Sequence, residues 1–375
     1  MTYKDKRVLV RVEYNVPLDK KGNITDNGRI LASIPTLKAI LKEKPKQLIL
    51  VTHLGRPKEG QDNSFLKTDV LAKELEQILK RNVLKVDNHG EKELPSSKIV
   101  FLENLRFDPR EKKGNAAFAK QLASLCDIYV NESFGTSHRK DASMYVVPKY
   151  VKKVIPGILL KDEVKKLKEV TSSKELTVIV GFAKVSDKIG VLKTLLKKAH
   201  KVFVGGKVLF AFLKAQDLDI GAVEVANEDV LIAKKLLKAY KKKILLPVDV
   251  TGPLQGKKRT FLIDEIPNGF QGFDVGPKTI QLWKKELLKS KVVFWNGPLG
   301  FFEKPPFNIG TNEIAQFLAI SSTSIKTIIG GGDTALAIKQ SGFAKSFYHI
   351  STGGGASLEF IEKNGKLPAL KSFRL

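Results

Sequence analysis

Residues 325–334 read Ile-Lys-Thr-Ile-Ile-Gly-Gly-Gly-Asp-Thr, and the rest of the chain is interpreted from this stretch. Its apolar first half is typical of a buried β-strand, and a helical pattern follows Thr334. Glycines between a strand and a helix let the backbone approach an anion, and the helix start offers unpaired N–H groups. Asp333 adds a carboxylate that can bind Mg²⁺. An ordinary strand-to-helix turn has the same pattern, so both interpretations stay open for this stretch alone.

Strand-like runs followed by glycine recur elsewhere in the chain. Three more apolar runs lead into glycine-containing loops, at 351–355, 296–300 and 205–206. In an open α/β sheet the loops at the carboxyl ends of the strands line one crevice, so we expect these loops to converge on one polyphosphate. The sequence contains neither Gly-x-Gly-x-x-Gly nor the P-loop motif. This excludes the usual glycine fingerprint of a nicotinamide dehydrogenase, which would otherwise be a third interpretation.

Strand and helix patterns alternate along the chain, which predicts an α/β fold of two Rossmann-like domains, each with a parallel sheet flanked by helices around an interdomain cleft. We expect strands at 8–12, 47–51, 99–101, 128–130, 176–180, 202–204, 244–246, 292–295, 325–329 and 347–350. We expect helices at 34–41, 68–80, 116–125, 159–170, 228–240, 280–288 and 356–361. Pro35 is expected in the first turn of its helix.

The length of 375 residues is sufficient for two domains with full cores. Periodicity lapses between Met144 and Pro156, where two prolines interrupt the pattern. We therefore place the domain boundary here, with a first domain at 1–153 and a second at 154–349.

The net charge of +26 favours anionic substrates. It also permits non-specific contact with nucleic acid, but lysine runs such as 241–243 lack the interleaved aromatic residues that stack on bases. We expect no specific nucleic-acid partner. No uncharged apolar run approaches the ~18 residues of a membrane span, and the N-terminus lacks the apolar region of a signal peptide. These features predict a cytoplasmic protein without a membrane partner.

Positively charged side chains follow several of the predicted strands in the first half. Individually, each is more often a surface charge than a ligand. Jointly they form a candidate cluster, because strand-end loops of one sheet lie side by side. Guanidinium groups match both carboxylate and phosphate, so the cluster suits a small molecule that carries both anions. Its members are Arg29, His53, Arg56, Arg106, His138 and Arg139.

Lys184 and Lys188 follow the predicted strand at 176–180. Their spacing of four residues predicts that they share one face at a helix start. Either lysine alone could be solvated, but beside the glycine loops both are candidate phosphate-binding cations.

Several ordered motifs together resemble the phosphoglycerate kinase family. They include Thr-His-Leu-Gly-Arg-Pro at 52–57 and Phe-Gly-Thr-Ser-His-Arg at 134–139, with further matching segments at 7–17, 25–30, 103–107, 183–189, 295–303, 330–334 and 351–359. The resemblance spans essentially the whole chain. It implies a monomeric, glycolytic kinase that transfers a phosphoryl group reversibly between 1,3-bisphosphoglycerate and ADP, giving 3-phosphoglycerate and ATP. It also implies a glycerate-binding first domain, a nucleotide-binding second domain and a C-terminal segment, about 350–375, that returns to the first domain.

The resemblance also implies roles for individual residues. The glycerate ligand would be held by Glu13, Asn15, Arg29, His53, Arg56, Arg106 and Arg139. The nucleotide would be held by Lys184, Lys188, Gly205, Gly272, Asn296, Glu303, Gly330, Gly331, Gly332, Asp333 and Thr334, with Mg²⁺ on Asp333. The catalytic set would be Arg29, Lys184, Gly331 and Gly354. Since phosphoryl transfer requires in-line placement and exclusion of water, we expect the domains to close around both substrates.

Five positions depart from the family pattern. Glu13 and Glu132 stand where aspartate is usual, Phe182 and Lys207 stand where glycine is usual, and Phe273 belongs to the same nucleotide-side region. A glycine-to-phenylalanine change adds bulk where the backbone approached a ligand closely. Two alternatives to an ordinary kinase follow, an altered nucleotide preference and a catalytically weakened relative with a binding role.

Overall fold

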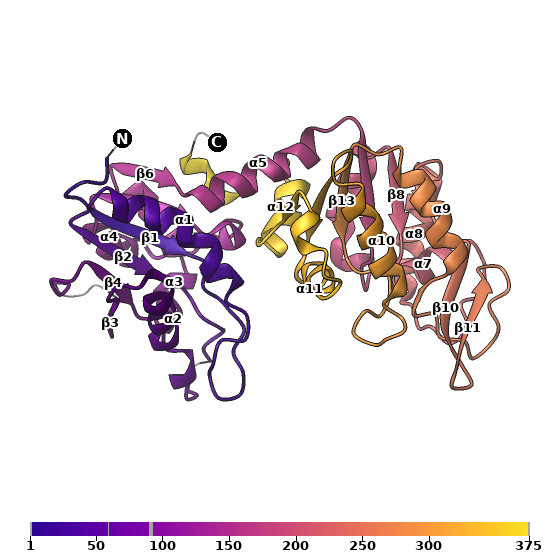
Figure 1. Cartoon of the computed structure of the whole chain (residues 1–375), viewed down its shortest axis with the longest axis horizontal. Helices are drawn as coiled ribbons and strands as arrows, with labels where there is room; N and C mark the ends of the chain where they lie inside the picture. Colours follow the sequence, from indigo (N-terminus) through magenta and orange to yellow (C-terminus); the bar gives the residue numbers. More distant parts are fainter. Residues whose placement is uncertain (1, 59, 90–92, 374–375) are drawn as a thin grey trace. The chain divides into compact units, whose positions relative to one another are not determined.

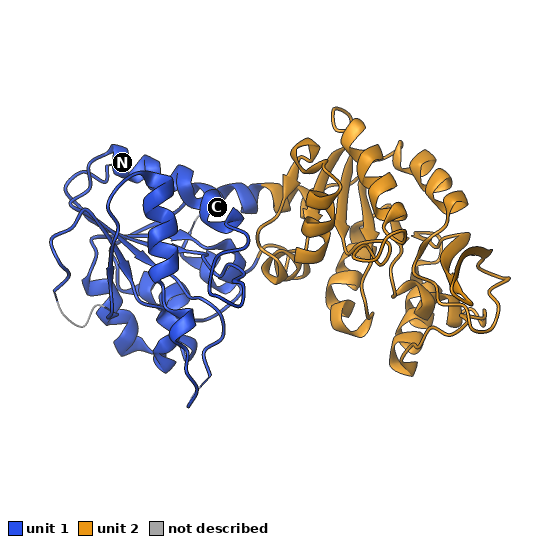
Figure 2. Cartoon of the chain, turned by 60° about the horizontal axis from the view of Figure 1, so that its bottom comes forward, with its two compact units in different colours: residues 1–165, 366–375 blue, residues 166–365 orange. Residues whose placement is uncertain are grey.

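The computed structural model describes residues 2–58, 60–89 and 93–373 and divides into two compact units. Unit 1 is Met1–Lys165 with Lys366–Leu375, and unit 2 is Lys166–Gly365 (Figure 2). The division falls within helix α5, Ile158–Ser172, twelve residues after the boundary expected at 153. The returning segment begins at Lys366 rather than near 350, and its Ala369 N–H donates to the Ser137 carbonyl at 3.0 Å.

In the described part of unit 1, six parallel strands form a sheet of order β3-β4-β2-β1-β5-β6 (Figure 1). The strands are β1 Arg7–Val12, β2 Gln47–Val51, β3 Leu84–Val86, β4 Ile99–Leu102, β5 Ile128–Glu132 and β6 Lys153–Pro156. The helices are α1 Gly28–Lys42, α2 Asp69–Leu79, α3 Pro109–Lys112 and α4 Ala116–Ser124. This part of the chain confirms the predicted parallel α/β architecture.

Alternate side chains of the unit 1 strands enter two different cores, as the period of a strand requires. Val8 and Val10 of β1 pack in one core with Leu37 of α1 and residues of α2. Leu9, between them, packs in the other core with Phe118 of α4. Both faces of the sheet are therefore covered, which explains the nearly continuous apolar composition of these strands.

Two predictions in unit 1 are wrong. Helix α1 begins at Gly28, so Pro35 lies inside the helix rather than in its first turn. The segment expected to be irregular contains β6, which pairs in parallel with β5. An edge strand tolerates Pro156, because a proline at its end need not donate to the ladder. Both errors arose because proline was given more weight than the surrounding apolar residues.

In the described part of unit 2, a second parallel sheet of six strands has the order β15-β14-β13-β7-β8-β9. The strands are β7 Leu176–Val180, β8 Lys201–Val204, β9 Ile244–Leu245, β13 Val292–Asn296, β14 Lys326–Gly330 and β15 His349–Ile350. The helices after α5 are α6 Ile189–Lys198, α7 Leu209–Lys214, α8 Asn227–Tyr240, α9 Pro277–Leu287, α10 Ile309–Ile320, α11 Gly332–Gln340 and α12 Gly355–Glu362. Trp283 of α9 and Ile314 of α10 pack on one face of this sheet, against Trp295.

A smaller antiparallel sheet of order β11-β10-β12 also belongs to unit 2, and the sequence did not predict it. Its strands are β10 Asp249–Leu254, β11 Lys257–Leu262 and β12 Asp274–Val275. Most of β11 is exposed and charged, so it carries no buried apolar pattern that would indicate a strand. The sheet positions the 272–276 loop, because β12 pairs with β10.

In the described part of the chain, no helix combines the length and apolar composition needed to cross a bilayer.

Glu132 connects the end of β5 to the start of α5. Its Oε1 accepts hydrogen bonds from the Thr36 hydroxyl at 2.5 Å and from the Leu159 N–H at 3.1 Å, and the Ile158 N–H donates to Thr36 at 2.8 Å. These contacts satisfy donors in the first turn of the helix. Oε2 is buried and accepts no hydrogen bond from the described residues. Burial raises the pKa of Glu132 to about 7, although the hydrogen bonds from Thr36 and Leu159 oppose the shift.

We expect Glu132→Gln to raise the free energy of unfolding of unit 1, relative to the unmodified chain, more at pH 8 than at pH 5. A carboxyl group whose pKa is higher in the folded than in the unfolded state contributes less to stability as pH rises from about 4.5 to about 7. Glutamine keeps one accepting oxygen and removes the buried charge. The difference in free energy of unfolding between the variant and the unmodified chain should therefore change by about 1–3 kcal/mol across that window. Urea unfolding followed by circular dichroism measures it. Glu169→Gln, at a partly exposed carboxylate, is the control, and equal pH slopes for Glu132→Gln and the unmodified chain would contradict the prediction.

Candidate functional site

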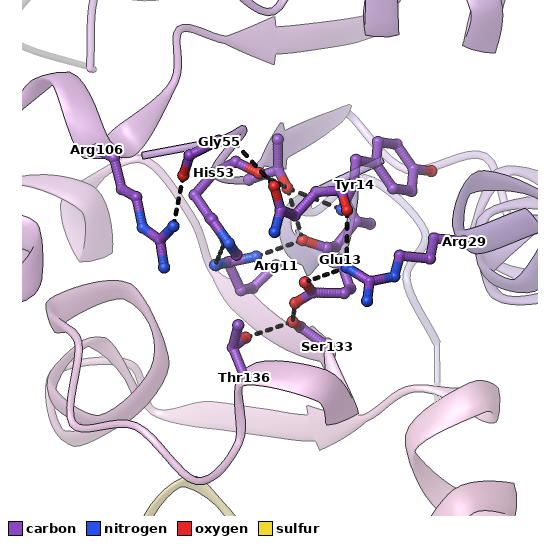
Figure 3. Close-up of polar contacts among 12 residues, drawn as sticks. Arg11, Glu13, Tyr14, Arg29, His53, Gly55, Arg106, Ser133 and Thr136 are labelled. Carbon is purple, nitrogen blue, oxygen red and sulfur yellow. Dashed lines mark hydrogen bonds and ion pairs between the residues drawn. The ribbon is translucent and has the colours of Figure 1, made fainter. Parts of the chain in front are cut away.

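The strand order of unit 1 reverses at β1. From β1 the chain continues to β2 on one side, while β5 pairs on the other side. Loops at such a switch point leave a crevice at the carboxyl edge of the sheet. Here the loop after β1 places the Glu13 carboxylate against the Ser133 hydroxyl, 2.6 Å away after β5. Ser133 Oγ also lies 2.6 Å from Thr136 Oγ1, so one hydrogen-bonded network joins the two loops (Figure 3).

Arg29 and Arg106 lie on opposite sides of this network (Figure 3). Arg29, in the first turn of α1, donates to the Asn15 carbonyl at 2.7 Å and pairs with Glu13 at 3.3 Å. Arg106 donates to the Gly55 carbonyl at 2.6 Å. Asn15 accepts from the Gly55 N–H at 2.9 Å and so links the β1 and β2 loops. The structure brings together most of the predicted glycerate residues of unit 1.

The remaining predicted residues of unit 1 lie around this group. Arg139 donates to Asp141 at 2.9 Å, and His138 is half-buried beside it in the chain. Arg56 is exposed after the β2 loop. Arg29 and Arg106, by contrast, donate to backbone carbonyls.

His53 is almost completely buried, and its partner is a residue that sequence reasoning missed. The Arg11 guanidinium donates to His53 Nδ1 at 2.9 Å (Figure 3). Arg11 is fully buried near the carboxyl end of β1. A charged residue within an otherwise apolar strand was the signal that could have identified it, because a buried guanidinium requires partners.

The electrostatics of the group favour an anion. Burial lowers the pKa of His53 well below its usual value, and Arg11, Arg106, Arg139 and Arg29 lower it further. Burial also lowers the pKa of Arg106 to about 10, with repulsion from Arg139 and Arg11 contributing. A small molecule with two or more negative charges would relieve this repulsion and accept hydrogen bonds from the guanidinium groups.

The strand order of unit 2 reverses between β7 and β13, and the predicted phosphate residues lie there. The Gly181 N–H after β7 donates to the Asn296 carbonyl at 2.9 Å. The Asn296 amide donates to the Gly330 carbonyl at 2.5 Å, and the Gly297 N–H donates to the Thr334 hydroxyl at 2.7 Å. The loops after β7, β13 and β14 are therefore hydrogen-bonded into one surface.

These loops enclose a cavity of 270 Å³. Helices α11 and α12 both begin at its wall, so N–H groups and positive dipole ends line it. Lys184 and Lys188 also line it, but not as one helical face. Lys184 precedes the short 3₁₀ turn Ser186–Lys188, so the predicted shared helix start is wrong while the convergence of both lysines on one cavity is observed.

Asp333 is the candidate Mg²⁺ ligand and is exposed at the wall of the same cavity. Among the residues that the structure describes, no group of three His, Cys, Asp or Glu side chains could hold a metal. A single carboxylate beside an anion-binding surface nevertheless fits Mg²⁺, which usually binds one or two carboxylates together with substrate phosphates and waters.

The glycines of these loops fall into two kinds. A Cβ on Gly181 would lie 1.9 Å from the Pro298 carbonyl oxygen, and one on Gly330 would lie 2.8 Å from the Phe294 ring. A Cβ on Gly332, Gly354 or Gly355 would meet no atom within 4 Å. The first kind allows the loops to pack, and the second leaves backbone open to a ligand.

Gly205 and Gly331 need comment as predicted ligand residues. Gly205 belongs to the packing kind, because its Cβ would lie 2.7 Å from Leu299. Its neighbours Gly206 and Lys207 line a cavity instead. Gly331 lines the 270 Å³ cavity with a φ of +89°, which favours glycine, and a Cβ there would also crowd Asn296 at 2.4 Å.

A second cavity of 640 Å³ shares Gly181, Phe182 and Asp333 with the first. Aromatic rings dominate its apolar wall, and the predicted residues Gly272 and Glu303 line it. Phe182 is buried at the junction of the two cavities, whereas Lys207 is exposed at the rim. An apolar compartment joined to a compartment lined by lysines and helix N-termini has the dimensions and chemistry of a candidate nucleotide site.

The wall that carries Glu303 is fixed by contacts to the 272–276 loop. Asp274 accepts hydrogen bonds from the Val275 N–H at 2.8 Å and the Gly310 N–H at 2.7 Å. Phe273 makes edge contacts with the rings of Phe301 and Phe307. Burial raises the pKa of Asp274 to about 7, against the effect of these N–H donors.

Comparison with known proteins gives one consistent result. The family model described as phosphoglycerate kinase matches residues 1–364. A phosphoglycerate kinase from Anaeromyxobacter dehalogenans (strain 2CP-C) is 42% identical, covering 98% of this chain and 96% of the relative. A solved phosphoglycerate kinase structure from Coxiella burnetii is 35% identical with a TM-score of 0.90, covering 99% of this chain and 97% of the other. One from Pyrococcus horikoshii OT3 is 28% identical with a TM-score of 0.85, covering 99% and 96%.

We expect Gly181→Ala to destabilise unit 2 by about 1–3 kcal/mol, because its Cβ would overlap the Pro298 backbone. Tryptophan fluorescence reports the change, since the two tryptophans, Trp283 and Trp295, are both buried in unit 2 and the Trp295 indole N–H donates to the Gly297 carbonyl at 2.7 Å. Gly355→Ala, at an open position, is the control and should unfold at the same urea concentration as the unmodified chain. Equal stability of the two variants would show that Gly181 is not required for packing.

Proposed function

The chain belongs to the phosphoglycerate kinase family, and we propose that its two units divide the reaction of that family between them. The chain is a phosphotransferase with a carboxyl group as acceptor, and it transfers a phosphoryl group reversibly between 1,3-bisphosphoglycerate and ADP. Unit 1 binds the glycerate substrate and unit 2 binds the nucleotide. The observation that carries this division is that the cations of unit 1 crowd around buried His53, whereas unit 2 contains the joined cavities.

In unit 1, Arg29 and Arg106 bind the anionic groups of 3-phosphoglycerate, and Arg56 and Arg139 complete the set. The carboxylate, phosphate and acyl phosphate of these ligands match guanidinium forks. Glu13 and Asn15 orient Arg29, because its guanidinium donates hydrogen bonds to the Glu13 carboxylate and the Asn15 carbonyl. His53 supplies a further donor from the β2 loop.

In unit 2, the 640 Å³ cavity takes the nucleoside and the 270 Å³ cavity takes the phosphates. Glu303 reaches the ribose hydroxyls, and Gly272 lines the wall beside it. Lys184, Lys188, Asn296 and the N-termini of α11 and α12 bind the phosphates, which places Gly331, Gly332, Thr334 and Gly354 next to the transferred group.

Asp333 would hold Mg²⁺ together with phosphate oxygens of the nucleotide. When bound, the ion would neutralise charge on the transferring group. Lys184 and Lys188 share this task from the segment after β7, because both residues line the same cavity.

The reaction needs no covalent intermediate with the protein, so the chain contributes placement and charge. Donor and acceptor oxygens must lie in line with the phosphoryl group. We therefore propose that the units close when both substrates are bound, so that Arg29 and Lys184 act on the same phosphoryl group. Closure also excludes water, which would hydrolyse the acyl phosphate.

The chain is also proposed to act as a monomer in the cytoplasm. The family resemblance supports both points. The net charge of +26 adds long-range attraction for its anionic substrates.

We expect Arg29→Ala and Lys184→Ala each to lower kcat by about 10²-fold or more, the effect of removing a preorganised charge from a transition state. A coupled assay of ATP formation from 1,3-bisphosphoglycerate measures it. Arg259→Ala and Lys193→Ala remove exposed cations elsewhere in unit 2 and should keep full turnover. Unchanged turnover in Arg29→Ala or Lys184→Ala would overturn the assigned roles.

We propose in addition that Phe182 alters nucleotide preference, because its ring stands at the junction where the family pattern has glycine. We expect Phe182→Gly to raise the affinity for GDP relative to ADP by about tenfold, since the widened cavity admits the extra amino group of guanine. Calorimetric titration with ADP, ATP, GDP and GTP measures this ratio. Lys207→Gly, at the exposed rim, should change it little. A constant ratio, with ordinary ADP preference in the unmodified chain, would refute the proposal.

A further inference from the structure

A chain of buried polar groups extends from His53 into the core of unit 1. Arg11 donates through one terminal nitrogen to His53 Nδ1 at 2.9 Å and through Nε to the Ser143 hydroxyl at 3.0 Å. The Ser143 hydroxyl donates to Glu111 Oε1 at 2.6 Å, and the Ser143 N–H donates to Glu111 Oε2 at 2.9 Å. The four residues are at most 2% exposed. Two of them, Ser143 and Glu111, have no place in the sites described above, and Arg11 enters there only as the partner of His53.

The direction of each hydrogen bond in this chain is fixed by chemistry. A guanidinium can only donate, so Nδ1 of His53 must accept and the ring proton must lie on Nε2. The other terminal nitrogen of Arg11 donates to the Val12 carbonyl, which orients the guanidinium further. Ser143 accepts from Arg11, so its own proton is directed to Glu111. The Arg11 guanidinium therefore sets the tautomer of the imidazole, and the Ser143–Glu111 pair holds the guanidinium in the orientation that does so.

We propose that Glu111, Ser143 and Arg11 are positioning residues that keep His53 neutral, with its Nε2–H available as a donor to the glycerate ligand. The proposal rests on the proposed function only for the identity of that ligand. A cationic ring would add repulsion to the arginines around it. A ring with its proton on Nδ1 would direct a lone pair at an anion. The cationic ring would also set an Nδ1–H against the Arg11 donor, so the neutral Nε2–H form is the one that accepts from Arg11 and still donates to an anion.

The charged groups around the chain are consistent with this assignment. His53 faces Arg11, Arg106, Arg139 and Arg29, and with burial all of them oppose a second proton on the ring. Glu111 faces Arg11 and Asp141. Arg11 thus lies between the His53 imidazole, which accepts its hydrogen bond, and the Glu111 carboxylate, which balances its charge. Ser143 connects Arg11 to Glu111.

The test combines NMR with kinetics on the full chain. The ¹⁵N spectra of its five histidines, with His53→Gln used for assignment, report the tautomer without any activity. We expect a single Nε2–H form of His53 that does not titrate between about pH 5 and 8. Ser143→Ala should produce mixed tautomers and raise KM for 3-phosphoglycerate by about tenfold, while KM for ATP stays within about twofold.

Control variants separate positioning from general destabilisation. Ser33→Ala removes another buried hydroxyl of unit 1, one that bonds Tyr14, and should leave the His53 tautomer and both KM values unchanged. Arg11→Met should make the ring titrate, and Arg11→Lys, which keeps a cationic donor, should restore the single tautomer. A single Nε2–H form in both Ser143→Ala and Arg11→Met would overturn the proposal. Loss of all turnover in the unmodified chain would refute the proposed function and leave the tautomer result standing.

Discussion

Parallel strand pairing is the constraint on which both candidate sites depend. It aligns the carboxyl ends of neighbouring strands, as in the register Asn296 with Gly330 and Asn296 with Val180. Where the connections after two neighbouring strands run to opposite sides of the sheet, the two loops separate. They then expose N–H groups and side chains at the carboxyl edge of the sheet. In unit 1 the loops at this point carry cations, and in unit 2 they carry glycines and the N-termini of helices. One geometric rule therefore yields two chemically different sites within a single chain.

The cation-rich edge of unit 1 carries an electrostatic cost in the absence of ligand. Burial, with repulsion from neighbouring arginines added to it, lowers the pKa of both His53 and Arg106, so the folded unit is less stable than it would be with neutral side chains there. A bound anion relieves the repulsion and stabilises the folded state by mass action. Glu13 balances part of the charge through Arg29, and Glu111 balances Arg11 from the core. The remaining positive charge is available for the ligand.

Much of the fold could be predicted from the sequence because buried parallel strands are nearly continuous apolar runs. Prediction failed where that signal was absent. Strand β11 is exposed and charged, β6 ends in a proline, and Pro35 lies inside α1, so local preference and tertiary packing disagree at these positions. The candidate cations and glycine loops were found through their place after strands, whereas Glu13, Asn15, Gly272 and Glu303 were implied only by the family resemblance. Arg11 was missed because it lies within a strand, where its function depends on side chains more than 40 residues away, such as Ser143 and His53.

The glycine loops illustrate why a motif alone cannot assign function. Gly181 and Gly330 are required by neighbouring atoms of the protein itself, so any fold with this packing would need glycine there. Gly332 and Gly355 begin α11 and α12 and meet no neighbouring atom that would exclude a side chain, whereas Gly354, with a φ of +52°, requires glycine for its backbone conformation. Packing explains the first group without a ligand. It does not explain the second, and backbone left open at two helix N-termini beside two lysines is what a phosphate needs.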